Sequence, residues 1–151
     1  MHSNEKLLRD LFEMIASLDT SNLDMGSLFN PEGILVKSIT PDVSWRMVGE
    51  HTKETGVYGV HRGYGEVANL FIQVNSYLEN YQMTDLVSVT ANDDMGVTLF
   101  RSSGVENGEP VDIEEVWVFR FKGGQISEIW DYNRIIHLQM VEDGERGKTG
   151  Y

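Results

Sequence analysis

A carboxylate interrupts an aromatic stripe in the C-terminal half of the sequence. If residues 111–121 form a β-strand, alternate side chains share one face, and that face carries Ile113, Glu115, Trp117, Phe119 and Phe121. Such an aromatic face is expected to point inward, where burial raises the pKa of a carboxyl group towards neutrality. Glu115 would then suit acid or base chemistry near pH 7. The alternative is a bulge that shifts the register by one residue and places Glu115 outside.

The rest of the sequence offers no motif for metal binding or for nucleophilic catalysis. The 151 residues include no cysteine, which excludes disulfides, thiolate catalysis and cysteine-based metal sites. The four histidines do not have metal-ligand spacing, and no acidic segment has the pattern of a calcium loop. Ser102-Ser103-Gly104 lacks the Gly-x-Ser-x-Gly turn of serine hydrolases. We therefore expect neither a metal nor a cofactor.

The charge of the chain argues against two classes of partner. Its 24 acidic residues outweigh 12 lysines and arginines, which gives a net charge of -12. A field of this sign repels phosphate backbones and anionic lipid surfaces, so we expect no nucleic acid and no membrane as partner. No segment approaches the roughly 18 apolar residues of a membrane-spanning helix, and the N-terminus has no apolar core of signal-peptide type. A cytoplasmic location is the default expectation.

Hydrophobic periodicity predicts helices in the first half of the chain. Apolar residues recur on one helical face over residues 4–18, and a short second helix is expected at 23–29. A loop over residues 31–41 leads into a strand at 42–48, and a longer glycine-containing loop follows. The clearest helix carries its apolar stripe at Val67, Leu70, Phe71, Val74 and Leu78.

The second half of the chain has the alternation and the turn chemistry of β-strands. Breaks rich in asparagine, aspartate and glycine separate four expected strands, at residues 85–91, 96–104, 111–121 and 125–135. Helices followed by an antiparallel meander predict an α+β fold. We expect a single domain over residues 1–151, with 142–151 as a loose tail. Its curved antiparallel sheet, with helices on the concave face, would form a cone that encloses a pocket.

This order of elements resembles the nuclear transport factor two-like superfamily, and especially its branch of SnoaL-like polyketide cyclases, ketosteroid isomerases and limonene-epoxide hydrolases. The resemblance extends over residues 7–138. Three motifs carry it: Val43-Ser44-Trp45-Arg46, Gly65-Glu66-Val67 at a helix start, and the segment that ends in Trp130-Asp131-Tyr132. It implies the cone-shaped fold, a small-molecule pocket and several site residues.

The implied catalytic residues lie on the expected final strands. SnoaL-like cyclases use a pocket aspartate near the final strand as an acid or base, and Asp131 is similar in position. In the epoxide hydrolases a final-strand aspartate followed by tyrosine works with an arginine and a second aspartate. Asp131, Tyr132 and Arg101 resemble three of these four residues, whereas Ser103 replaces the second aspartate. A structural ion pair of Asp131 with Arg101 or Arg134 is the alternative interpretation.

Aromatic side chains are expected to form the wall of the pocket. The wall and ligand-binding candidates are Trp45, Tyr77, Tyr81, Trp117, Phe119 and Tyr132. Arg46, next to Trp45, would lie at the pocket mouth, and His61 would lie in a lid formed by the glycine-containing loop. An exposed strand arginine and a solvated loop histidine are the alternatives for these last two residues.

Together these observations favour a cofactor-free acid/base enzyme of the isomerase or cyclase type. Its substrate would be an apolar, carbonyl-bearing or polycyclic small molecule, with Asp131 moving the proton and Arg101 holding the neighbouring oxygen. A non-catalytic small-molecule-binding or interaction module and an epoxide-hydrolase-like hydrolase remain open, because one fold hosts many functions. Members of this branch commonly pair through the outer face of the sheet, and outward-facing Val116 and Val118 predict a homodimer.

Overall fold

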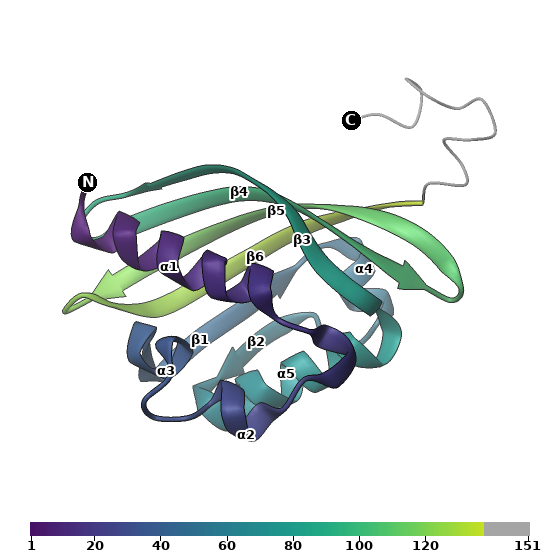
Figure 1. Ribbon diagram of the computed structural model, residues 1–151, viewed down its shortest axis with the longest axis horizontal. Coiled ribbons are helices and arrows are strands. Elements are labelled where there is room, and N and C mark those ends of the chain that lie inside the picture. The colour runs from purple at the N-terminus through teal and green to yellow at the C-terminus, as the bar shows by residue number, and fades with distance from the viewer. Residues whose placement is uncertain (138–151) are drawn as a thin grey trace.

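Helices occupy most of the first half of the chain and long strands the second half (Figure 1). The structure, a computed structural model, describes residues 1–137, so the tail expected at 142–151 lies outside the described residues. The helices are α1 (Ser3–Ser17), the 3-10 turn η1 (Thr20–Asn22), α2 (Met25–Leu28), α3 (Ile34–Ser38), α4 (Glu50–Glu54) and α5 (Gly63–Tyr77). The strands are β1 (Ile39–Val48), β2 (Gly59–Arg62), β3 (Glu79–Ala91), β4 (Met95–Glu106), β5 (Glu109–Lys122) and β6 (Gln125–His137).

The strands form one curved sheet in the order β2-β1-β6-β5-β4-β3. The last four strands are an antiparallel meander, as the turn signals predicted. β1 extends the sheet by pairing in parallel with β6, and β2 pairs antiparallel with β1. On the concave side, α1 lies across β3 and β4 while α5 packs on β1 and β2 (Figure 1). The α+β cone expected from the sequence is confirmed.

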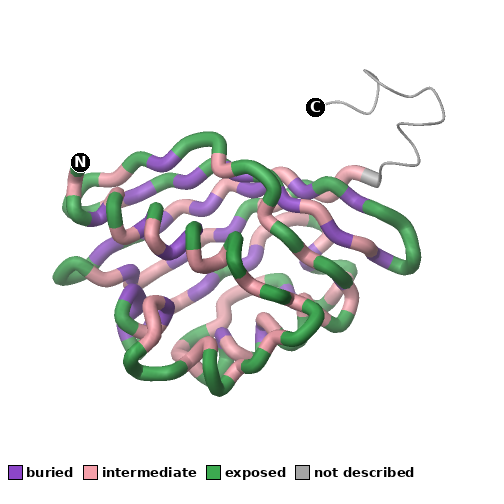
Figure 2. The backbone as a smooth tube through the Cα atoms, viewed as in Figure 1, coloured by how far each residue is buried: buried purple, intermediate pink, exposed green. Residues whose placement is uncertain are grey.

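Side-chain alternation decides what each strand buries. Along β4 and β5, buried and exposed residues alternate almost without exception (Figure 2). The buried positions face the helices because every second side chain of a strand points to the same face. On β5 these inward residues include Ile113, Glu115, Trp117 and Phe119. The inward orientation predicted for Glu115 is therefore correct, and no register shift intervenes there.

An aromatic cluster holds α1 against the middle of the sheet. Phe12 is fully buried, and its ring centroid lies 4.8 Å from that of Phe100 and 5.3 Å from that of Trp117. Phe119 completes the cluster at 6.3 Å from Phe12. Tilted and edge-to-face pairs at these distances add about 0.5–1.5 kcal/mol each beyond the burial of their area. This packing fixes the middle of the sheet, from which the functional side chains project.

Several short elements were not evident from the sequence. The expected loop at 31–41 contains α3 and the start of β1, and the later glycine-containing loop contains α4 and β2. β3 begins at Glu79, well before the expected start at residue 85. Both faces of the strand are largely polar in this part, so the sequence shows no alternation, and pairing with β4 defines the strand instead. Within residues 1–137, none of the helices is long and apolar enough to cross a membrane.

Candidate active site

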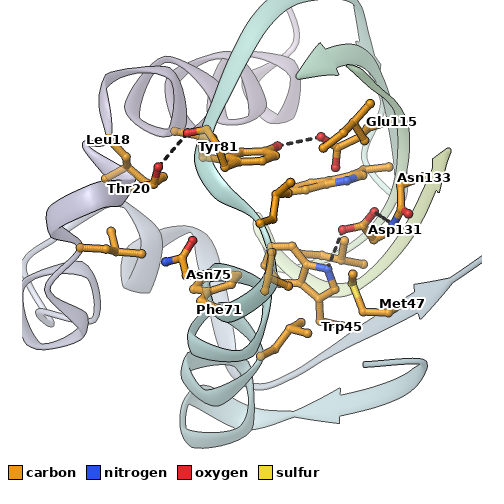
Figure 3. A pocket seen from close by; sticks show the side chains of 18 of the residues that line it. Leu18, Thr20, Trp45, Met47, Phe71, Asn75, Tyr81, Glu115, Asp131 and Asn133 are labelled. Carbon is orange, nitrogen blue, oxygen red and sulfur yellow. Dashed lines mark hydrogen bonds between the residues drawn. The ribbon is translucent and has the colours of Figure 1, made fainter. Parts of the chain in front are cut away.

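A cavity of about 150 Å³ lies between the concave face of the sheet and the helices. Apolar side chains from α1, α5 and the strands form most of its wall, among them Leu11, Ile15, Met47, Leu70, Phe71, Ile113 and Ile129. Two acidic side chains, Glu115 from β5 and Asp131 from β6, converge on it (Figure 3). Both are buried, with 5% and 4% of their surface exposed. The arrangement places two carboxyl groups in an otherwise apolar pocket.

Glu115 is held by two hydroxyl donors. The phenol of Tyr81, at the start of β3, donates to Oε2 of Glu115 at 2.7 Å, and the Ser102 hydroxyl on β4 donates to the same oxygen. Burial raises the pKa of Glu115, while the hydrogen bonds from Ser102 and Tyr81 oppose that rise. These donors stabilise the ionised form, because hydrogen bonds to a carboxylate favour its charge. Glu115 is thus suited to carry the negative charge of the pair.

Asp131 has weaker hydrogen-bonding partners. The indole N–H of Trp45 donates to Oδ2 at 3.4 Å, and the Asn133 amide donates to Oδ1 at 3.2 Å. Burial, followed by the repulsion of the Glu115 charge, raises the pKa of Asp131 to about 8. A pKa of about 8 favours the protonated form of Asp131 at neutral pH. Burial is the larger cause, and the proximity of Glu115 adds to it, because two buried carboxyl groups that face one cavity do not both ionise readily.

No basic residue of the described chain balances the charge of the Glu115–Asp131 pair. Among the described residues that line the cavity there is no lysine or arginine, and the single histidine is His51 on α4. Nε2 of His51 lies 2.6 Å from Oε2 of Glu106 at the end of β4, and neither atom has a geometrically aligned hydrogen-bond partner among the described residues. The ring of His51 also packs edge-on against Tyr77, at 5.8 Å between centroids. His51 is therefore paired with Glu106 and not with the two carboxyl groups of the cavity.

Arg101 does not lie beside Asp131, and the prediction that it belongs to the pocket is wrong. On β4 the inward side chains are those of Phe100 and Ser102, so Arg101 between them points to the outer face. There it lies in register with Asp85 on β3 and Glu114 on β5. An Arg101–Asp131 pair, whether catalytic or structural, is excluded by this alternation. The arginine-dependent arrangement of the epoxide-hydrolase relatives is therefore not formed.

The same alternation corrects two further pocket assignments. Arg46 lies between the inward side chains of Trp45 and Met47 on β1, and is exposed on the outer face. Tyr132 follows inward Asp131 on β6 and is likewise on the outer face, with 45% of its surface exposed. Neither residue lines the cavity.

Phe119 and His61 are also outside the cavity wall, for different reasons. Phe119 faces inward but is fully buried in the aromatic cluster with Phe12. His61 lies on β2, where a ring nitrogen is 2.8 Å from the carbonyl oxygen of Val57. It is thus tied to the chain just before β2 and does not belong to a lid over the pocket.

Four of the expected wall residues do line the cavity, namely Trp45, Tyr77, Tyr81 and Trp117. Trp45 and Trp117 pack edge-to-face at 4.9 Å between ring centroids. The indole N–H of Trp117 is buried and has no aligned hydrogen-bond partner among residues 1–137. It nevertheless lowers the pKa of both carboxyl groups as a misaligned hydrogen-bond donor to each of them. Contact between these side chains and a ligand remains a prediction.

The family model described as SnoaL-like domain matches residues 29–129. This chain belongs to the SnoaL-like domain family. Together with the fold, the match places it in the nuclear transport factor two-like superfamily. No curated protein is similar enough to be matched to this SnoaL-like chain.

Solved structures share the fold of this SnoaL-like domain at low sequence identity. A nuclear transport factor two-like protein of unknown function from Burkholderia pseudomallei is 18% identical, with a TM-score of 0.71 over 94% of this chain and 97% of that one. A protein assigned to the SnoaL-like polyketide cyclases, from a Jannaschia species, is 15% identical, with a TM-score of 0.66 over 93% and 89% of the two chains. A protein of ketosteroid isomerase-like fold from Catenulispora acidiphila, in complex with trimethylamine, is 14% identical, with a TM-score of 0.54 over 72% and 84%. These likenesses show the fold.

The SnoaL-like site also contains residues that the sequence did not reveal. Ser102 could have been found, because it shares the inward face of β4 with Phe100. His51 gave no such signal, since its burial depends on contact with Glu106 in a distant hairpin. Asn133, two residues after Asp131, is on the same face of β6 and lines the cavity. Within residues 1–137, no group of three or more acidic or histidine side chains is arranged to hold a metal ion.

Proposed function

We propose that this SnoaL-like domain is a cofactor-free acid/base enzyme, of the isomerase or cyclase type, for an apolar carbonyl-bearing or polycyclic small molecule. The observation that carries the proposal is the pair of buried carboxyl groups, Glu115 and Asp131, on one apolar cavity. Perturbed carboxyl groups that converge on a pocket are typical of catalytic sites. We assign the base to Glu115 and the acid to Asp131.

The assignment of roles follows from the hydrogen bonds. Tyr81 and Ser102 stabilise charge on Glu115, so its carboxylate is available to accept a proton from a substrate carbon next to a carbonyl group. Asp131 keeps its proton and can donate it, fully or as a hydrogen bond, to the carbonyl oxygen on which charge develops. The C–H bond breaks, an O–H bond forms on Glu115, and an enol results. In a conjugated substrate, Glu115 then returns its proton to a different carbon while the enol oxygen gives its proton back to Asp131, which completes an isomerisation. In a cyclisation the enol carbon attacks a second carbonyl carbon, the new alkoxide takes the proton from Glu115, and the first oxygen again returns its proton to Asp131.

The apolar wall supports this chemistry. Transfer of the substrate into the cavity removes water that would otherwise hydrate the carboxylate and compete for the carbonyl oxygen. Aromatic rings from Trp45, Phe71 and Trp117 supply the apolar contact that binding needs. General acid and base groups of this kind each contribute roughly 10²–10⁴-fold to a rate.

A non-catalytic binding module is the second candidate, favoured by one observation. Both carboxyl groups are almost fully buried, and Oε2 of Glu115 already accepts two hydrogen bonds. Groups satisfied in this way can simply stabilise the pocket. Hydrolysis through a pocket-bound water lacks its supporting arginine, because Arg101 is on the outer face.

Exchange of carbon-bound hydrogen separates the two candidates. β-Tetralone, a bicyclic ketone with acidic hydrogens next to its carbonyl group, would be incubated with the protein in deuterium oxide and followed by proton NMR. Acid/base catalysis predicts exchange at those carbons well above the buffer rate. The Glu115→Gln variant should lose this excess over the buffer rate. Exchange at the buffer rate, with β-tetralone shown to bind by calorimetry, would favour the binding module.

A further inference from the structure

The wall of the cavity carries negative charge only. Glu115 and Asp131 are its acidic groups, and His51, the basic one among the described lining residues, is engaged by Glu106 at 2.6 Å. The chain as a whole has a net charge of -12. An anionic ligand would have to lose its hydration and approach these carboxyl groups without a compensating cation, at a cost that a buried unpaired charge makes prohibitive. This environment therefore disfavours carboxylates and phosphates as ligands.

Two hydrogen-bond donors of the cavity are not fully used by acceptors of the protein. The indole N–H of Trp117 can only donate, and it is buried with no aligned acceptor among the described residues. The carboxyl proton of Asp131 is a second donor on the same cavity wall, directly across from Trp117 in the pairing of β5 with β6. A buried donor without a well-aligned acceptor is unfavourable. A ligand that brings an acceptor atom to this corner would supply that acceptor.

A cationic ligand would meet a less suitable environment. The carboxylate that would pair with it, Glu115, already receives hydrogen bonds from Tyr81 and Ser102 on Oε2. An ammonium group supplies donors only, so it would leave the Trp117 N–H unpaired. Its positive charge would also disfavour the protonated form of Asp131. The same corner accommodates a neutral oxygen without either penalty.

We infer that the cavity selects uncharged ligands with a hydrogen-bond-accepting oxygen, and that the Asp131 carboxyl and the Trp117 indole N–H are the donors to that oxygen. The inference rests on the proposed assignment of Asp131 as the acid, and it deepens that assignment by naming the charge of the ligand and the second donor. Trp117 thereby contributes a specific polar contact in addition to apolar surface.

Four matched probes test the selection by charge. Methyl β-naphthyl ketone, β-isopropenylnaphthalene, β-naphthoate and β-naphthylmethylammonium share one ring system and differ in the polar group, so their dissociation constants at pH 7 can be compared directly by calorimetry. We expect the ketone to bind roughly three- to tenfold more tightly than the isosteric alkene, the scale of one neutral hydrogen bond. The naphthoate and the ammonium should bind more weakly than both. Tightest binding of either ion, equal binding of ketone and alkene, or no binding of any probe would overturn the inference.

A pair of tryptophan variants tests the donor. Trp117→Phe should abolish the preference for the ketone over the alkene, whereas Trp45→Phe should keep it, because the Trp45 N–H is already used by Asp131. A preference that survives in folded Trp117→Phe would contradict the donor role. In the wild-type protein, which has three tryptophans, the indole proton resonance of Trp117 should shift downfield with the ketone and less with the alkene. Equal shifts would count against the role even if the variant does not fold.

These binding results are independent of turnover. If β-tetralone exchanges no hydrogen while the ketone preference and its dependence on Trp117 hold, the catalytic proposal fails and the inference about the ligand stands. If exchange is fast but the ketone has no advantage over the alkene, the catalytic proposal stands and the inference about the ligand fails.

Discussion

The phenol of Tyr81 donates a 2.7 Å hydrogen bond to Oε2 of Glu115, across from β3 to β5 at the back of the cavity. Because this bond favours the ionised carboxylate, Tyr81→Phe should raise the pKa of Glu115. A hydrogen bond to a charged group is worth about 1.5–3 kcal/mol, so the acidic limb of the pH–rate profile for β-tetralone exchange should move up by about one to two pH units. Tyr77→Phe, which alters another tyrosine of the wall, should leave that limb in place. An unchanged limb in Tyr81→Phe would contradict the role of Glu115 as base.

The buried acid predicts an unusual dependence of stability on pH. The pKa of Asp131 is about 8 in the folded protein, against an ordinary value of 3.8. Between these values unfolding releases a proton, so the free energy of unfolding should fall as pH rises from about 4 to about 8, by up to about 1.4 kcal/mol per pH unit. Asp131→Asn should flatten this slope. Exposed Asp112 provides the control, since Asp112→Asn removes a charge but should keep the slope. Urea titrations at several pH values would measure it, and identical slopes in wild type and Asp131→Asn would count against a protonated Asp131.

We predict a homodimer contact on the outer face of the sheet. Val116 and Val118 are half-buried there, and their neighbours on β4, Leu99 and Val97, have 39% and 37% of their surface exposed. A contiguous apolar patch of this kind marks an interaction surface. We expect a dimer by light scattering at micromolar concentration, and a monomer for Leu99→Lys. Ile72→Lys, at a 53% exposed position on α5, should remain dimeric. A wild-type monomer would refute the prediction.

Chelation tests the expectation that no metal takes part. Exchange of β-tetralone hydrogen should survive prolonged dialysis against EDTA, because the proposed chemistry needs only the two carboxyl groups. Loss of exchange that a divalent ion restores would overturn the acid/base proposal in its present form.

Much of the fold and part of the site could be predicted from the sequence. The inward orientation of Glu115 could be predicted because its face of the strand carries Trp117, Phe119 and Phe121, whereas the other face carries charged residues and two valines. Arg101 was misplaced because β4 carries apolar side chains on both faces. Val97 and Leu99 are exposed on the same side as Arg101, while Thr98 and Phe100 are buried. A strand of this kind has no polarity signal to fix its orientation, so only the resemblance to other proteins indicated a pocket position for Arg101.

Other features depend on contacts that no local pattern encodes. The contact between His51 and Glu106 joins α4 to the hairpin between β4 and β5, and each residue alone looks like an ordinary polar surface residue. The high pKa of Asp131 likewise arises from its burial and from the charge of Glu115 beside it. Only the register of β5 with β6 brings the two carboxyl groups together.

If the buried pair of Glu115 and Asp131 moves protons on a bound ketone, Asp131→Asn should impair the reaction without preventing binding. The substitution keeps the shape of the side chain and a hydrogen-bond donor, but removes the transferable proton. Hydrogen exchange of β-tetralone per folded molecule should fall by about two orders of magnitude or more, while methyl β-naphthyl ketone still binds and the protein stays folded. A rate of exchange equal to that of the wild type, measured on the same folded preparation, would contradict the account.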